Sequence, residues 1–164
     1  MSDFEIDILI EEHRWTESVE LIDALASRCI HETIAYLKTT SFPLKVFSEV
    51  SLALVNDAKI QDLNARYRHK NKPTNVLSFP AMEIDGFAPI LGDIVLSYET
   101  VIGEAKARSL PPNDHVAHLI IHGFLHLQGY DHENDSDADI METIEIKTLE
   151  GLGIANPYVK GELL

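Results

Sequence analysis

The chain has a single cysteine, no long apolar run and no basic leader. Cys29 is the only cysteine in 164 residues, so no disulfide forms within the chain and we expect a small apolar side chain in a helix. No apolar run approaches the roughly 18 residues of a membrane-spanning helix, and the acidic start MSDFEIDILIEEHRW does not resemble a secretory signal. We therefore expect a cytoplasmic protein without a membrane partner, folded as one domain over residues 1–164.

Basic residues are scarce as well. There are 13 Lys and Arg against 27 Asp and Glu, giving a formal net charge of −14. Proteins that hold nucleic acid by bulk electrostatics are normally basic, so any such contact requires a local basic patch. One segment, RYRHKNK, concentrates Arg66, Arg68, Lys70 and Lys72. It is interpreted either as a solvated helix end and loop or as a phosphate-binding groove.

Hydrophobic periodicity predicts four strands and five helices. The strands are expected over residues 4–10, 44–56, 75–79 and 93–98. The helices are expected over residues 16–37, 57–67, 99–109, 113–129 and 135–153. This order predicts an α+β (α/β-like) domain, with a small mixed sheet of about four strands packed by helices.

Histidines provide the strongest chemical signal. Five of the eight fall between residues 115 and 132, within HVAHLIIHGFLHLQGYDH. His122 and His126 lie four apart and share one helix face, and Gly129 allows the chain to turn so that His132 returns to the same point. Three imidazoles with an open fourth position are typical of a catalytic zinc site. We therefore predict a metal-binding helix of metalloprotease-like type.

Neighbouring polar residues are open to several interpretations. His118 lies four before His122, and we expect it to support a ligand or face the substrate rather than bind the metal. His115 is expected in the solvated first turn of the helix. Asp131 either orients a ligand through its second ring nitrogen or is a plain turn residue, and Ser78 is expected to pack within the sheet.

Gly123 separates this motif from zinc peptidases. The spacing H-x-x-x-H-x-x-G-x-x-H is that of metzincin proteases, which need a glutamate directly after the first histidine to activate water. Gly123 cannot act as that base. Peptidase activity is therefore disfavoured, and we expect the glycines of the motif to leave room beside the ion.

Taken together, these segments resemble the YbeY family of bacterial endoribonucleases. The resemblance covers HGFLHLQGYDH at 122–132, LNARYRHKNKPTNVLSFP at 63–80, LGDIVLS at 91–97 and LGIANPY at 152–158. It implies a cytoplasmic, zinc-dependent endoribonuclease of single-stranded RNA, acting in small-subunit ribosomal RNA maturation and ribosome quality control. Carried over residue by residue, His122, His126 and His132 would bind one Zn²⁺, and Arg68 would be the catalytic arginine.

The chemistry of phosphodiester cleavage is consistent with that implication. Zinc can polarise a phosphate or activate a bound water, and a guanidinium can clamp phosphate oxygens in a bidentate way. We expect ribosomal RNA and ribosomal proteins or assembly factors as partners, and no DNA. The alternative is a non-catalytic, metal-stabilised ribosome assembly factor, which would suit the eight acidic residues within residues 131–150.

Overall fold

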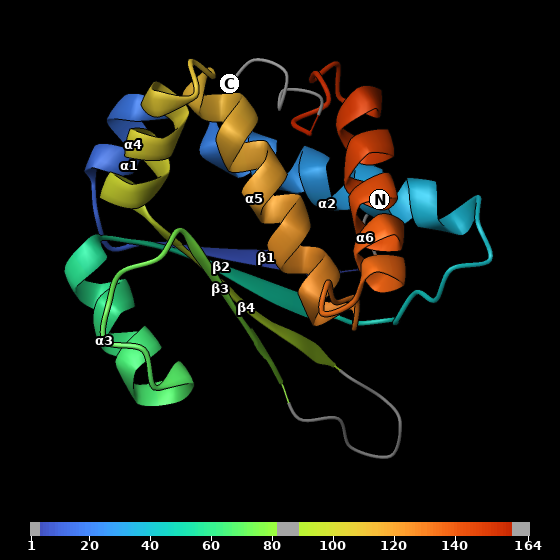
Figure 1. The fold of residues 1–164 in the computed structure, drawn as a ribbon, viewed down its shortest axis with the longest axis horizontal. Helices are drawn as coiled ribbons and strands as arrows, with labels where there is room; N and C mark the ends of the chain where they lie inside the picture. Colours follow the sequence, from blue (N-terminus) through green and yellow to red (C-terminus); the bar gives the residue numbers. More distant parts are fainter. Residues whose placement is uncertain (1–3, 82–88, 159–164) are drawn as a thin grey trace.

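A four-stranded mixed sheet forms the centre of the structure, a computed structural model that describes residues 4–81 and 89–158 (Figure 1). The spatial order is β1 (Glu5–Ile10), β2 (Glu49–Val55), β4 (Ile90–Ser97) and β3 (Val76–Pro80). The first three strands are parallel, and β3 runs antiparallel to β4 at one edge. The expected α+β class with a four-stranded mixed sheet is confirmed.

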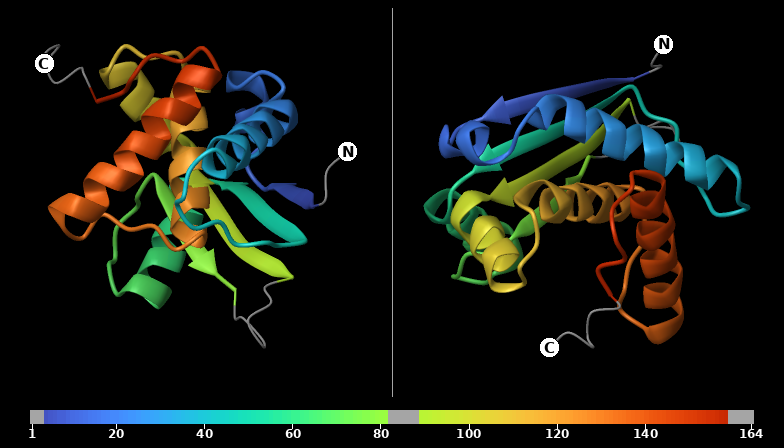
Figure 2. Two further views of the ribbon diagram at one scale, coloured as in Figure 1. Left: turned by 90° about the vertical axis from the view of Figure 1, so that its right-hand side faces the viewer. Right: turned by 90° about the horizontal axis from the view of Figure 1, so that it is seen from above.

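Helices cover both faces of this sheet unequally (Figures 1 and 2). The described helices are α1 (Arg14–Ser18), α2 (Ile22–Lys38), α3 (Asp57–Arg68), α4 (Tyr98–Ala107), α5 (Pro112–Leu127) and α6 (Asp135–Gly151). On one face, α2 and α5 enclose the main core with buried residues such as Leu52, Ile94 and Phe124. On the other face, α3 covers a small cluster of Val55, Ile60 and Val95. None of these described helices is long and apolar enough to cross a membrane.

The segment expected as one helix over residues 16–37 is divided in two. Helix α1 ends at Ser18, Val19 is extended, and Leu21 adopts a left-handed conformation with φ of 50° before α2 begins. The break lets Trp15 become fully buried and donate its indole N–H to the carbonyl of Val55 at 2.9 Å. No glycine or proline marks this turn, so periodicity alone predicted a continuous helix.

Of two other expectations, the start of the second strand is corrected by the structure and the burial of Cys29 is confirmed. The strand expected from residue 44 begins only at Glu49, which pairs with Glu5 at the start of β1. Cys29 is confirmed as a buried apolar residue of α2, and burial raises the pKa of its thiol to about 12. The thiol is therefore inert at neutral pH.

Helix α5 lies directly against the sheet at Gly123. A Cβ atom there would lie 2.7 Å from Cγ2 of Ile94 and 3.2 Å from Oγ of Ser78. Ser78 in turn donates a hydrogen bond from its hydroxyl to the Gly123 carbonyl at 3.0 Å. The absent side chain therefore allows helix–sheet contact, and the expectation that Gly123 leaves room beside a metal ion is wrong.

Replacing Gly123 with alanine is expected to destabilise the fold by about 1–3 kcal/mol, because the methyl group overpacks the interface with Ile94. Gly103→Ala provides the matched control, since a Cβ at that position of α4 meets nothing within 4 Å. At position 103 the higher helix propensity of alanine should raise the free energy of unfolding by up to about 1 kcal/mol. Urea unfolding of the two variants measures both effects, and equal shifts would contradict this assignment of Gly123.

Candidate metal centre

Helix α5 ends in a turn that brings the third histidine back to the first two. The N–H of Gly129 bonds the carbonyl of His126 at 3.0 Å, and the N–H of Tyr130 bonds the carbonyl of Leu125 at 3.0 Å. These two bonds form a Schellman cap, whose left-handed position is Gly129 with φ of 102°. The chain reverses there, and His132 follows three residues later.

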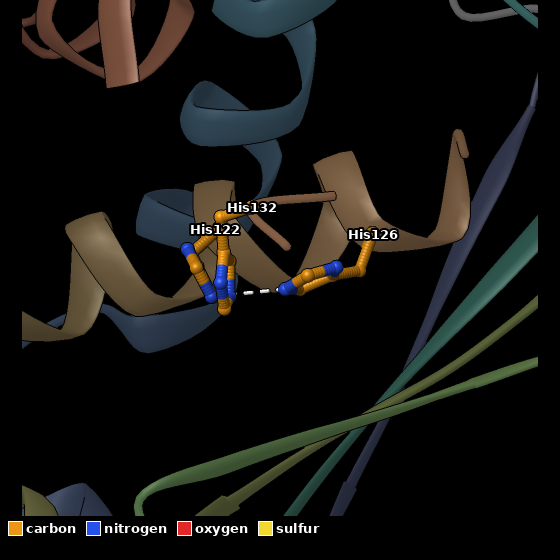
Figure 3. Close-up of side chains that lie close together, drawn as sticks. All are labelled: His122, His126 and His132. Atoms are coloured by element: carbon orange, nitrogen blue, oxygen red, sulfur yellow. Dashed lines mark hydrogen bonds between the residues drawn. The ribbon is translucent and has the colours of Figure 1, made fainter. Parts of the chain in front are cut away.

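His122, His126 and His132 form one compact group (Figure 3). One ring nitrogen from each lies within 4.8 Å of the other two, and the Nε2 atoms of His122 and His126 are 3.1 Å apart. The ring of His132 stacks on that of His122 at 5.4 Å between centroids. Among the described residues, this is the group of histidine, cysteine and carboxylate side chains that could hold a metal ion.

Hydrogen bonds fix which nitrogen two of the imidazoles present. His122 donates from Nδ1 to the Glu145 carboxylate at 2.7 Å, and His126 donates from Nδ1 to the Tyr130 carbonyl at 3.0 Å. Both rings therefore expose Nε2 as the lone-pair nitrogen toward the common point. Burial, followed by the neighbouring imidazoles, lowers the pKa of His126, which favours the neutral form that a metal requires.

The donor set fits zinc. Two Zn–N bonds of about 2.0–2.1 Å at a tetrahedral angle separate their nitrogens by about 3.3 Å, close to the 3.1 Å between His122 and His126. His132 is exposed and the other two histidines are partly buried, so the group lies at the surface. Three nitrogen ligands at an accessible site leave a fourth position for water or substrate.

Glu145 of α6 is a buried member of the site that sequence reasoning missed. Its side chain is fully buried and accepts hydrogen bonds from His122, from His118 at 2.7 Å and from the hydroxyl of Tyr158. Burial would raise the pKa of Glu145, but the bonds from His118 and His122 outweigh it and lower that pKa to about 2. An ionised carboxylate thus orients His122 and increases its basicity.

A signal for Glu145 is present in the sequence. Helix α6 buries Met141, Ile144, Thr148 and Leu149, and Glu145 falls on the same stripe at helical spacing. A carboxylate on a buried stripe requires partners. The many carboxylates of α6 by themselves predict a solvated acidic face for this helix, and for Glu145 that prediction is wrong.

Replacing Glu145 with glutamine is expected to weaken metal binding by about 10–100-fold, because the amide keeps the volume but loses the charge that orients His122. Glu150→Gln is the matched control, since Glu150 is exposed on the same helix and its carboxylate pairs with Lys147 at 4.0 Å. Competition with a chelating dye measures both affinities. Equal affinities in the two variants would remove Glu145 from the site.

The remaining polar residues of the motif have distinct contacts. His115 is buried and bonds Glu104 at 2.9 Å, so its expected place in a solvated first turn is wrong. His118 lies outside the three-histidine group and shares Glu145 with His122. Asp131 accepts a hydrogen bond from the backbone N–H of His132 at 2.7 Å, which is the role of a turn residue.

Arg68 reaches the sheet edge next to α5. It lies exposed in the last turn of α3, donates to the Ser78 carbonyl at 2.6 Å, and places its guanidinium carbon 4.9 Å above the Phe79 ring. Ser78 also contacts Gly123, the residue after His122. The contacts therefore connect Arg68 to α5 through β3, whereas Arg66 pairs with Asp62 on α3 at 2.8 Å.

The fold and the histidine group define an α+β protein with a candidate three-histidine metal centre. Comparison with known proteins gives the family: the model of Endoribonuclease YbeY matches residues 9–153. Proteins named Endoribonuclease YbeY include one from Rhizobium etli, 43% identical and covering 96% of this chain and 95% of its own. Another from Methylocella silvestris is 47% identical and covers 93% of this chain and 85% of its own. The chain belongs to the Endoribonuclease YbeY family.

A solved structure supports the fold independently. The solution structure of TM1509 from Thermotoga maritima matches with a TM-score of 0.54, covering 91% of this chain and 92% of that one. The two sequences are 24% identical. At that identity the match bears on the arrangement of strands and helices alone.

Proposed function

We propose that this chain is a zinc-dependent endoribonuclease that cleaves single-stranded RNA in the cytoplasm. In this proposal it matures the ends of small-subunit ribosomal RNA and takes part in ribosome quality control. The observation that carries the proposal is the convergence of His122, His126 and His132 at α5, a helix that packs against β3, the strand that Arg68 of α3 contacts. Relatives that match over more than nine-tenths of this chain are named endoribonucleases, which supports RNA as the substrate.

The residues have separable roles in this chemistry. When bound by the three histidines, zinc supplies Lewis-acid polarisation of a phosphate oxygen or a water of lowered pKa. Glu145 holds His122 in the binding orientation. Arg68 carries five N–H donors, so its bond to the Ser78 carbonyl leaves donors for a phosphate, whose charge grows in the transition state.

Two observations argue against peptidase activity. The position that supplies the base in metzincins is Gly123, and a side chain there would begin against Ile94 of the sheet. The buried carboxylate next to the site, Glu145, is occupied by His118, His122 and Tyr158. Neither position offers a free carboxylate to a water on the metal.

A panel of matched substrates tests the proposed activity. The zinc-loaded protein should cleave single-stranded RNA. It should leave intact duplex RNA and single-stranded DNA of the same sequence, and also an unfolded polypeptide. Product ends then identify the nucleophile, because a 2′,3′-cyclic phosphate requires attack by the ribose 2′-hydroxyl. Cleavage of polypeptide without cleavage of RNA would overturn the proposal.

A non-catalytic role in ribosome assembly is the second candidate, and the acidic face of α6 favours it. Asp135, Asp137 and Asp139 are exposed on its first turns, which suits a basic ribosomal protein or assembly factor as a partner. Reversing these three charges should abolish co-purification with ribosomal components and leave RNA cleavage unchanged. Unchanged co-purification would remove α6 as the docking surface.

A further inference from the structure

A cavity of about 360 Å³ opens beside the metal centre. It lies between the end of α4, the first turns of α5 and the start of β3, and His118 and His122 form part of its wall. This volume is at the lower end of the range for small-molecule pockets, about 300–1,000 Å³. His122 belongs both to the three-histidine group and to the cavity wall. A phosphodiester at the metal centre would therefore place one of its two nucleosides at the cavity mouth.

The walls of this cavity combine apolar side chains with a polar end at Glu104, and Arg108, His118, His122 and Tyr158 add further polar groups. Val76, Ala107 and Leu119 supply the apolar part. At the polar end, the Glu104 carboxylate accepts hydrogen bonds from Asn75 at 3.0 Å and from His115 at 2.9 Å. A flat ring with polar edges matches this lining, and single-stranded RNA presents unstacked bases of that shape.

The ionisation of Glu104 determines which base edges suit the cavity. Burial would raise the pKa of Glu104, but the hydrogen bonds from His115 and Asn75 outweigh it and lower that pKa. The group is therefore an acceptor at neutral pH. Amino groups of adenine, cytosine and guanine can donate to it, whereas the two carbonyl groups that flank the N–H of uracil are repelled.

We propose that the cavity lined by Val76, Glu104, Ala107 and Leu119 binds the base of a nucleotide flanking the cleaved phosphodiester and prefers an amino-bearing base to uracil. The inference rests on the proposed RNA cleavage and deepens it. It assigns Glu104 as a specificity-determining residue.

Ala107→Phe tests occupancy, because Ala107 is exposed at the last position of α4 and a larger side chain there blocks the cavity without entering the core. Lys106→Phe places the same ring on the neighbouring exposed residue, which does not line the cavity. We expect Ala107→Phe to lower kcat/KM for single-stranded RNA about tenfold, the effect of losing one stacked base. Metal content should be unchanged, and Lys106→Phe should match the unmodified protein.

Oligonucleotides with single abasic sites around the cleavage position supply the RNA half of a double-mutant cycle with Ala107→Phe. Removing the base that occupies the cavity should lower kcat/KM of the unmodified protein about tenfold. It should not lower kcat/KM of the Ala107→Phe variant any further. Additive losses would mean that the base binds elsewhere and would overturn the proposal. Glu104→Gln should reduce the preference of the unmodified protein for cytidine over uridine at that position, and an unchanged preference would remove Glu104 from recognition.

Mononucleotide binding separates failure of this inference from failure of the proposed function. In methyl NMR spectra of the zinc-loaded protein, cytidine 5′-monophosphate should shift the signals of Val76 and Leu119, and Ala107→Phe should abolish those shifts. This result would support the cavity even for a protein that cleaves no RNA. Active protein whose spectrum is unmoved by the nucleotide would refute the cavity and leave the nuclease assignment intact.

Discussion

Replacing His126 with alanine is expected to remove metal binding and RNA cleavage together. Its Nε2 lies 3.1 Å from that of His122, and its Nδ1 is held by the Tyr130 carbonyl, so its loss leaves two ligands of three. Metal-ion catalysis contributes several kcal/mol of transition-state stabilisation, which corresponds to a fall in cleavage of about a thousandfold or more. Atomic absorption and a cleavage assay on the same preparation measure both quantities.

His13→Ala is the control for this experiment. His13 is exposed just before α1 and lies outside the three-histidine group. Its replacement should change neither zinc content nor cleavage. Full cleavage by a metal-free His126→Ala protein would show that the reaction does not use this centre.

Replacing Arg68 with alanine is expected to reduce cleavage by about 10²–10³-fold with zinc content unchanged. That is the usual effect of removing one well-placed donor to transition-state charge. The side chain is exposed and makes one hydrogen bond to Ser78 and one cation–π contact with Phe79, so the fold should lose no more than about 2.5 kcal/mol. Arg68→Lys should recover part of the rate, because it restores the charge but not the bidentate fork.

Arg66→Ala is the matched control, since Arg66 lies in the same turn of α3 but pairs with Asp62. It should retain cleavage near the level of the unmodified protein. Equal losses in the two alanine variants would indicate general attraction of RNA by the basic segment. An Arg68→Glu variant that folds and keeps zinc separates the two candidate functions: lost cleavage with partner binding intact supports the enzyme.

Local patterns of apolar residues predicted most helices and strands of this fold, because each type of element has its own hydrophobic period. The helix expected over residues 57–67 is observed as Asp57–Arg68, and the helix expected over residues 113–129 as Pro112–Leu127. The break before α2 was not predictable, because burial of Trp15 against the carbonyl of Val55 decides it, across 40 residues of sequence. Strand order likewise depends on contacts between distant segments.

The candidate site likewise combines residues that the sequence spacing predicts with residues that only tertiary contacts bring together. His122, His126 and His132 are close in sequence, and the glycine at 129 marks the turn between them, so their convergence was predictable from spacing. Glu145 comes from the next helix and meets His122 only in the folded chain. His115 was misplaced because its burial depends on Glu104 of α4, a partner that a helical pattern does not reveal.

Stepwise return of zinc to metal-stripped protein tests directly whether cleavage depends on an ion at the three-histidine group. Zinc content and cleavage of single-stranded RNA are measured at each addition and again after a chelator. Cleavage should rise in proportion to bound zinc, reach its maximum at one ion per chain and disappear with the chelator. Undiminished cleavage by the metal-stripped protein would contradict that dependence.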